Sequence, residues 1–147
     1  MEILTRILAE KARSNLFKFH WRCDKINLIN LCFADDLMVF CKGEKPSVEL
    51  IMLGLQEFQA LTGLCPSPGK SHVFFSGVDD RVKGEIVEVS RFQVGQLPVR
   101  YLGVPLITTK LKSGDCKSLI DRIGKRIQNW NNKSLSYVGR AQLIKSI

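Results

Sequence analysis

The chain has 147 residues, of which 45% are hydrophobic and 24% charged, and these values exclude a disordered or fibrous protein. Its 22 basic and 14 acidic side chains give a net charge of +8. The longest apolar run, residues 37–41, is far shorter than the ~20 residues of a membrane span, and the N-terminus does not resemble a signal peptide. We expect one domain, or a piece of a larger one, in the nucleus or cytoplasm, with no membrane partner. The sequence does not predict the oligomeric state.

The positive charge is concentrated toward the C-terminus. Residues 1–109 carry 13 basic and 12 acidic side chains, whereas residues 110–147 carry 9 basic and 2 acidic ones. A concentrated basic segment attracts polyanions, of which nucleic acid is the commonest inside cells. A solvated helix face rich in lysine would give the same pattern. An anionic membrane surface is disfavoured because no large aromatic and aliphatic face accompanies the charge.

The cysteines favour free thiols over a metal site. None of the five, at positions 23, 32, 41, 65 and 116, belongs to a Cys-x-x-Cys pair. His20 and Cys23 have a compatible ligand spacing, but no second pair completes a zinc site. We expect reduced thiols that pack as small hydrophobic groups, in a reducing compartment.

The first half of the chain predicts a helix, a β-hairpin and a second helix. Apolar residues recur at helical spacing over residues 2–14. Two short apolar runs, residues 26–33 and 37–42, flank an Asp-Asp pair and are typical of a hairpin. The next helix is expected to begin near Ser47, a candidate N-cap residue, and to end at Gly63, a natural C-cap residue.

The second half predicts a strand, a short helix, an extended segment and two further helices. We expect the strand over residues 72–76 and the extended segment over residues 98–106. Asp79–Asp80 is better explained as the cap of the short helix than as a metal site. The first of the two further helices carries an apolar stripe, Leu119, Ile120, Ile123, Ile127 and Trp130. The last, residues 139–147, stops while still periodic, which favours a truncated element.

Asp35 and Asp36 lie at the tip of the predicted hairpin. Two adjacent carboxylates on a rigid turn supply hard oxygen ligands, which suit Mg²⁺ bound to substrate phosphates. A plain Asp-Asp turn is the alternative, since aspartate favours turns through hydrogen bonds to its own backbone.

Four ordered segments resemble one enzyme family, and the resemblance extends over nearly the whole chain. Residues 33–37 (Phe-Ala-Asp-Asp-Leu) resemble the aromatic-x-Asp-Asp hairpin of reverse transcriptases, with surroundings similar to the plant non-LTR, LINE-type retrotransposons. Residues 62–71 resemble the segment after the palm helix, residues 97–106 the primer-grip hairpin, and residues 126–140 the start of the thumb. The resemblance implies an α+β fold, with a partial palm over residues 1–109 and a truncated, basic, helical thumb start over residues 110–147.

The resemblance assigns catalytic roles to three residues. Asp35 would be a catalytic Mg²⁺ ligand and Asp36 its supporting carboxylate in nucleotidyl transfer by two Mg²⁺ ions. Lys70 would lie near the incoming deoxynucleoside triphosphate, where a cation can neutralise or protonate the leaving pyrophosphate. A loop lysine in solvent is the alternative for Lys70.

Other residues are implied to contact the template-primer, an RNA or DNA duplex. Tyr101, Leu102 and Gly103 would form the turn that steadies the primer end, although Tyr101 could equally be a core aromatic. With the apolar stripe packed inward, five cations would face the nucleic-acid backbone: Arg122, Lys125, Arg126, Lys133 and Arg140. Trp130 could stack on a base, but packing between helices is the simpler interpretation.

The resemblance also implies that a catalytic group is missing from this chain. A complete reverse transcriptase palm supplies another metal-binding aspartate from a strand well upstream of the Asp-Asp hairpin. Here Asp24 is the sole aspartate before Asp35, and it lies in a charged segment. We therefore expect a fragment of a retrotransposon RNA-directed DNA polymerase that holds Mg²⁺ poorly and is inactive alone. A non-catalytic, basic nucleic-acid-binding module derived from it is the alternative.

Overall fold

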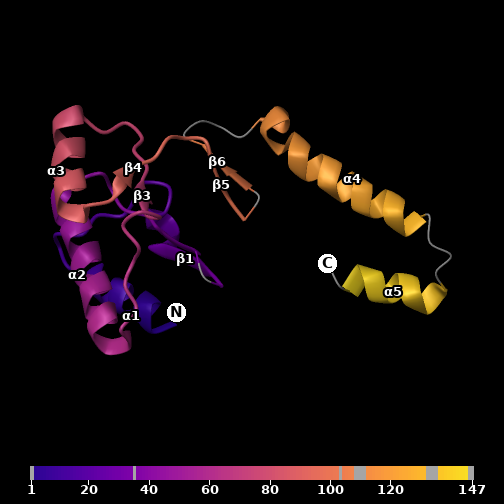
Figure 1. Cartoon of the computed structure of the whole chain (residues 1–147), viewed down its shortest axis with the longest axis horizontal. Coiled ribbons are helices and arrows are strands. Elements are labelled where there is room, and N and C mark those ends of the chain that lie inside the picture. The colour runs from indigo at the N-terminus through magenta and orange to yellow at the C-terminus, as the bar shows by residue number, and fades with distance from the viewer. Residues whose placement is uncertain (1, 35, 103, 108–111, 132–135, 146–147) are drawn as a thin grey trace. The chain divides into compact units, whose positions relative to one another are not determined.

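Helices alternate with short strands in the computed structural model, which describes residues 2–34, 36–102, 104–107, 112–131 and 136–145 (Figure 1). The chain divides into unit 1, residues 1–96, and unit 2, residues 97–147. The predicted α+β class is confirmed, and each sheet among the described residues has two strands. The division expected at residue 109 concerns polymerase subdomains and stays a prediction.

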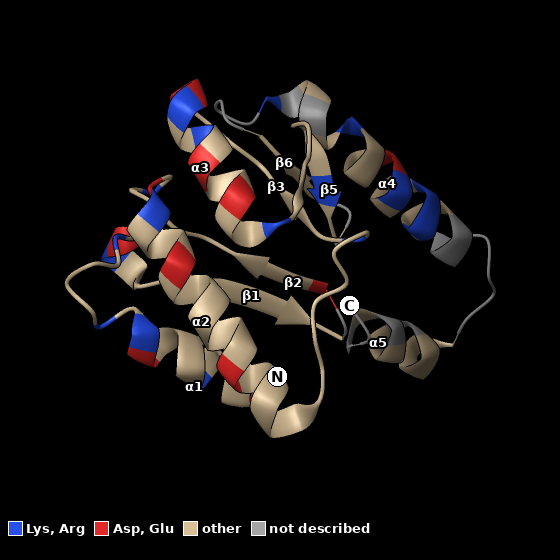
Figure 2. Cartoon of the chain, turned by 60° about the vertical axis from the view of Figure 1, so that its left-hand side comes forward, with Lys and Arg blue, Asp and Glu red and all other residues tan. Residues whose placement is uncertain are grey.

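In unit 1, helices α1 and α2 pack against each other, and a β-hairpin lies next to them. Its elements are α1 (Glu2–Lys11), η1 (Asp24–Ile26), β1 (Asn30–Phe33), β2 (Asp36–Val39), α2 (Lys45–Thr62), β3 (His72–Val73), α3 (Asp80–Ser90) and β4 (Gln93–Val94). Figure 2 shows α1 beside α2, with the β1–β2 hairpin next to them. The predicted first helix and first hairpin are thus confirmed, with shorter strands than the apolar runs implied.

The core of unit 1 lies between α1, α2 and the hairpin. Its buried members are Leu4, Ile7, Leu8, Phe17, Ile29, Ile51, Leu55 and Phe58. Leu4, Ile7 and Leu8 are spaced three and four residues apart, so they share one face of α1. Gly54 of α2 permits close approach, because a Cβ there would lie 3.1 Å from Leu8 Cδ2. Each such side chain contributes roughly 1.5–3 kcal/mol by its burial.

The N-terminus of α2 differs from the prediction. Glu44 is the N-cap residue, so Ser47 lies inside the first turn, and the prediction of Ser47 as the cap was wrong. Pro46 occupies the first turn, where its missing N–H costs nothing, and this lets the helix begin earlier. The buried Ser47 Oγ instead accepts a hydrogen bond from the Lys18 backbone N–H at 3.0 Å. The predicted C-cap is confirmed, because Gly63 has φ 74° and its N–H donates to the Gln59 carbonyl at 2.8 Å.

The strand predicted over residues 72–76 contains only the two residues of β3. It pairs in parallel with β4, an element that was not predicted. Beyond this pairing the Phe74 ring packs over the backbone at Gly95, where a Cβ would overlap it. In the sequence, α3 lies between β3 and β4. Its predicted cap is confirmed, because the Asp79 carboxylate accepts a hydrogen bond from the Arg81 backbone N–H at 2.9 Å.

Unit 2 contains a second hairpin and the two C-terminal helices. Its elements are β5 (Val99–Tyr101), β6 (Val104–Leu106), η2 (Ser113–Cys116), α4 (Lys117–Asn131) and α5 (Tyr137–Lys145). The extended segment of the sequence is thus an antiparallel hairpin, with Tyr101 paired to Val104. The last helix begins at Tyr137, two residues earlier than predicted, and residues 146–147 lie outside the described residues. No helix in the described part of the chain is both long and apolar enough to cross a membrane.

Candidate functional site

The β1–β2 hairpin carries the candidate carboxylates at its tip. Phe33 pairs with Asp36, so only Ala34 and Asp35 connect the two strands. Ala34 has φ 60°, in the left-handed region that alanine rarely adopts. Asp36 begins β2 and is exposed, whereas Asp35 lies outside the described residues. The tight connection therefore holds one carboxylate at an exposed position beside the residue expected to be the principal metal ligand.

The two faces of this hairpin differ in their surroundings. Leu37 and Val39 are partly buried against the core, while Phe33, opposite Asp36, is 60% exposed. Because directly paired residues share a face of the ladder, Asp36 and Phe33 lie on the outer face, away from the core. The base of the hairpin is fixed by two hydrogen bonds, from Phe40 N to the Ile29 carbonyl (2.7 Å) and from Asn30 Nδ2 to Thr5 Oγ1 (3.0 Å). A packed scaffold of this kind positions carboxylates well.

Lys70 lies in a turn of unit 1 that follows α2. Its backbone N–H donates to the Ser67 carbonyl at 3.0 Å, and its side chain is exposed. Among the described residues, no hydrogen bond or ion pair links the Lys70 side chain to the hairpin. The role of Lys70 at a triphosphate stays a prediction.

The β5–β6 hairpin has the same tight connection. Tyr101 pairs with Val104, so Leu102 and Gly103 form the tip, of which Gly103 lies outside the described residues. Leu102 has φ 53° and is 52% exposed, which is an unusual conformation for a bulky residue. Tyr101 is half-buried and so is not a fully enclosed core aromatic.

Backbone strain singles out these two tips. Four described residues other than glycine have positive φ, and two of them, Asn27 and Arg91, are helix C-cap residues, a place where the left-handed conformation is usual. The other two are Ala34 and Leu102, at positions where hairpins ordinarily use Gly, Asn or Asp. Strained conformations persist where the surrounding structure enforces them, and they cluster at functional sites. Each tip has a residue other than Gly or Asn at its first position. This feature of the sequence could have predicted the strain, but it was not part of the prediction.

The candidate nucleic-acid contacts of unit 2 lie on α4. Arg122, Lys125 and Arg126 are exposed, and blue segments mark the Lys and Arg residues along this helix in Figure 2. Arg140 lies on α5 but its side chain is not described, as is also true of Trp130 on α4. Lys133 lies outside the described residues.

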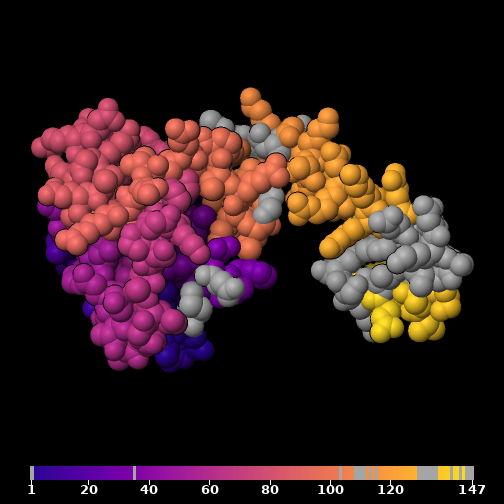
Figure 3. All heavy atoms as spheres, viewed as in Figure 1, coloured from indigo at the N-terminus to yellow at the C-terminus, as the bar shows by residue number. Residues whose placement is uncertain are grey.

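The expectation that the apolar stripe of α4 packs inward was wrong for its three isoleucines, whereas Leu119 is partly buried. Ile120, Ile123 and Ile127 are 58%, 49% and 53% exposed, and Figure 3 shows side chains standing out along α4. Within the described part of unit 2, η2 leads directly into α4, and no other element there packs extensively against the helix. With about 3.6 residues per turn, the three isoleucines lie opposite Arg122, Lys125 and Arg126. The three cations are therefore exposed on a different face of α4 from the isoleucines.

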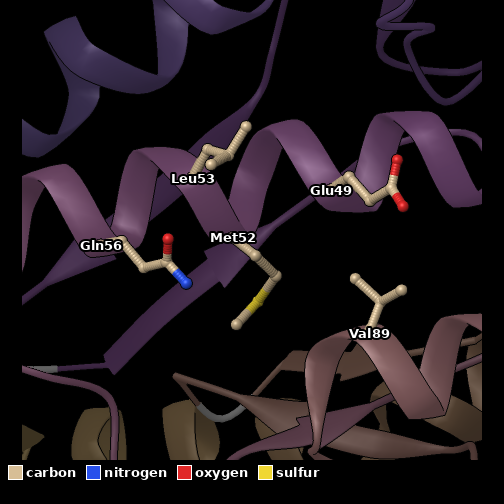
Figure 4. A pocket seen from close by; sticks show the side chains of 5 residues that line it. All are labelled: Glu49, Met52, Leu53, Gln56 and Val89. Atoms are coloured by element: carbon tan, nitrogen blue, oxygen red, sulfur yellow. The ribbon is translucent and has the colours of Figure 1, made fainter.

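An open groove of about 330 Å³ runs between α2 and α3 (Figure 4). Its lining residues are Glu49, Met52, Leu53, Gln56 and Val89. Glu49 is the one ionisable group in this lining, and its carboxylate lies 3.9 Å from the Lys45 ammonium. The groove contains none of the predicted site residues and offers no pair of groups for acid–base or nucleophilic chemistry.

A metal site at the β1–β2 tip would depend on Asp35 and Asp36. Within the described ranges, no three His, Cys, Asp or Glu side chains gather in one place, but Asp35 is outside those ranges. The adjacent carboxylates of Asp35 and Asp36 fit a hard cation in donor type, and the described one, Asp36, is exposed. No protein-family model matches this chain, and no solved structure matches it.

Proposed function

We propose that this chain is part of a LINE-type reverse transcriptase, comprising the end of the palm and the start of the thumb. One observation carries the proposal: the β1–β2 hairpin is tightly closed, with a strained Ala34, and has Asp36 exposed at its tip next to Asp35. The second strained tip, at Leu102, falls where the resemblance expects the primer grip. Both unusual features coincide with residues chosen from motifs alone.

In the parent enzyme Asp35 and Asp36 would hold Mg²⁺, which stabilises the negative charge that develops on phosphoryl oxygens during nucleotidyl transfer. Lys70 would neutralise the leaving pyrophosphate. The Tyr101–Leu102 tip would contact the primer backbone, and a glycine at position 103 permits close approach. The cations of α4 would bind phosphates without regard to sequence.

We expect the 147-residue chain alone to show no primer extension. Asp24, the sole aspartate before Asp35, lies in η1 ahead of β1, and Glu2 and Glu10 lie on α1. None of these positions corresponds to a strand that could bring a further carboxylate to the tip. Robust DNA synthesis with Mg²⁺ on an RNA template, abolished by Asp35→Asn, would contradict this part of the proposal.

Paramagnetic Mn²⁺ tests the carboxylate pair directly. Added to the isotopically labelled chain, Mn²⁺ should broaden the backbone amide signals of Phe33 and Asp36 first, and Asp35→Asn should remove that selectivity. The matched control is Asp80→Asn in the other Asp-Asp pair, where Asp80 forms an ion pair with Lys83 at 2.7 Å. Broadening that is no stronger at the tip than at Asp79–Asp80 would exclude a metal role for Asp35 and Asp36.

A non-catalytic nucleic-acid-binding module is the second candidate. The observation in its favour is the charge of unit 2, where residues 97–147 carry 10 basic and 2 acidic side chains. In that case Asp35→Asn would leave Mn²⁺ broadening and duplex binding unchanged, whereas substitutions at Arg122, Lys125 and Arg126 would weaken duplex binding.

A further inference from the structure

The segment between α1 and β1 combines exposed apolar groups with positive charge. Trp21 is 72% exposed, and Leu16 and Ile26 on either side are 62% and 69% exposed. The Arg22 guanidinium carbon lies 4.7 Å from the centre of the Trp21 ring, as a cation–π contact requires. Residues 15–25 follow no helical or strand periodicity, and the sequence therefore predicted no regular element there.

This exposed ring is carried by a firmly anchored backbone. Phe17 and Cys23, on either side of Trp21, are buried, with 7% and 8% of their surface exposed. The Cys23 N–H donates to the His20 carbonyl at 2.8 Å, closing the turn that contains Trp21. Lys18 is fixed from both sides, by Ser47 Oγ and by the Lys42 N–H, which donates to the Lys18 carbonyl at 2.9 Å. Because the backbone that carries the Trp21 ring is already ordered, binding at this ring costs little further conformational entropy.

The charge of unit 1 is concentrated in the same segment. Residues 1–96 contain 12 basic and 12 acidic side chains, but residues 13–25 contain four basic ones against Asp24 alone. The four cations are Arg13, Lys18, Arg22 and Lys25, of which Lys18 forms an ion pair with Glu44 at 3.3 Å. The rest of the unit is therefore net negative, so a polyanion that approaches unit 1 is directed to this segment.

We propose that residues 13–26 bind single-stranded nucleic acid, with an unpaired base stacked on Trp21 and its phosphates beside Arg22 and Lys25. Stacking on an exposed aromatic ring among cations is the common mode of single-strand binding, and it tolerates any base. A paired base cannot reach such a ring without unstacking its duplex, so the segment favours single strands. The inference does not depend on the β1–β2 hairpin being a polymerase site.

Tryptophan fluorescence reports on this contact in the full chain. The chain has two tryptophans, so Trp130→Phe leaves Trp21 as the one indole fluorophore. A 20-nucleotide oligo(dT) should quench the emission of Trp21 in this variant, and a blunt duplex of equal length should quench it much less. Unchanged emission while anisotropy shows the oligonucleotide bound would overturn the proposal.

Substitution then measures what the ring contributes. Trp21→Ala should weaken oligo(dT) binding about 5- to 150-fold, the range that loss of one stacked base implies, while Trp21→Phe retains most of the affinity. Leu64→Ala is the matched control, because Leu64, like Trp21, is an exposed apolar residue of unit 1 (62% exposed) but lies outside residues 13–26. Equal affinities of Trp21→Ala and the parent chain, or equal losses for single strand and duplex, would overturn the proposal. Circular dichroism checks that each variant is folded.

The result is separable from the polymerase proposal. Mn²⁺ broadening at Phe33 and Asp36 reports on the hairpin tip, and Trp21→Ala should leave it unchanged. Quenching with no selective Mn²⁺ broadening would support this inference and contradict a metal role for Asp35 and Asp36. The reverse pair of results would support the metal role and overturn single-strand binding at residues 13–26.

Discussion

Unit 1 and unit 2 differ in both packing and charge. All ten of the buried hydrophobic side chains in the described residues lie in unit 1, and none lies in unit 2. Residues 1–96 carry 12 basic and 12 acidic side chains, whereas residues 97–147 carry 10 and 2, so 10 − 2 accounts for the whole net charge of +8. Because unit 1 has its own core, we expect it to be the more stable of the two. Unit 2 would gain stability if a polyanion or another apolar surface bound to it.

The largest expected effect tests the difference in packing. Leu8, 1% exposed, lies in the core of unit 1, so Leu8→Ala should lower the free energy of unfolding by about 2–5 kcal/mol. Ile123→Ala is the counterpart in unit 2, where the side chain is 49% exposed, and should change it by less than about 0.5 kcal/mol. Urea unfolding followed by circular dichroism measures both. Equal losses would mean that α4 is packed in solution and that the contrast between the units is wrong.

The next effect tests the difference in charge. The triple variant Arg122→Gln, Lys125→Gln and Arg126→Gln should weaken binding to a DNA duplex by roughly tenfold or more. Its salt dependence should also fall, by about 0.9 in log–log slope for each phosphate that the variant no longer neutralises. Anisotropy titrations at several salt concentrations measure both quantities.

The matched control for this variant removes three cations from unit 1 instead. Lys45→Gln, Arg81→Gln and Lys83→Gln lower the net charge by the same amount, but these residues lie in ion pairs with Glu49, Glu85 and Asp80. The control should keep most of the affinity and the slope. Equal losses in the two triple variants would show that binding follows net charge rather than the basic face of α4.

The sequence predicted those parts of the fold that depend on local rules. Helix spacing gave α1, α3 and α4, and Gly63 and Asp79 marked helix ends because a left-handed residue and a side-chain acceptor act within a single turn. The cap predicted at Ser47 was wrong because the helix begins earlier, with Pro46 in its first turn. The Ser47 hydroxyl accepts a hydrogen bond from Lys18, 29 residues away in the chain, which local rules do not predict. The strand β4 was missed since its two residues are defined only by their pairing to β3.

The candidate site was predictable in its motifs but not in its geometry. The position of Asp35 and Asp36 between two apolar runs predicted a hairpin tip, and the register confirms that hairpin. The left-handed Ala34 and Leu102 follow from two-residue connections, whose length depends on which residues pair across the strands. The exposure of Ile120 and of Trp21 could not be read from the sequence, because apolar residues at regular or irregular spacing are usually expected inside.

A smaller effect tests whether the neutral unit depends on its carboxylates. Partial burial opposes ionisation of Glu44, but hydrogen bonds from Lys42 and Lys18 outweigh it and hold the pKa of Glu44 below its usual range. A lowered pKa stabilises the fold above the unfolded pKa, near 4.5, and this stability is lost as the pH falls through the folded pKa. Glu44→Gln should therefore cost about 1 kcal/mol in urea unfolding at pH 7 and almost nothing near pH 3. A loss that is the same at both pH values would assign the cost to packing rather than to charge.

The smallest effect concerns the strain that both units share at their hairpin tips. A left-handed alanine costs roughly 1–2 kcal/mol, and glycine removes that cost but loses more backbone entropy on folding. Ala34→Gly should therefore raise the free energy of unfolding of unit 1 by about 0.5 kcal/mol, whereas Ala34→Val should lower it. Leu102→Gly should change it little, because the β5–β6 hairpin lies in unit 2, whose described residues include no buried hydrophobic side chain.

If the strain serves to hold Asp35 and Asp36 in place, Ala34→Gly should also weaken the selective Mn²⁺ broadening at Phe33 and Asp36 while it stabilises the fold. A variant that is less stable yet keeps its Mn²⁺ selectivity would show that the left-handed Ala34 is neither strained nor functional.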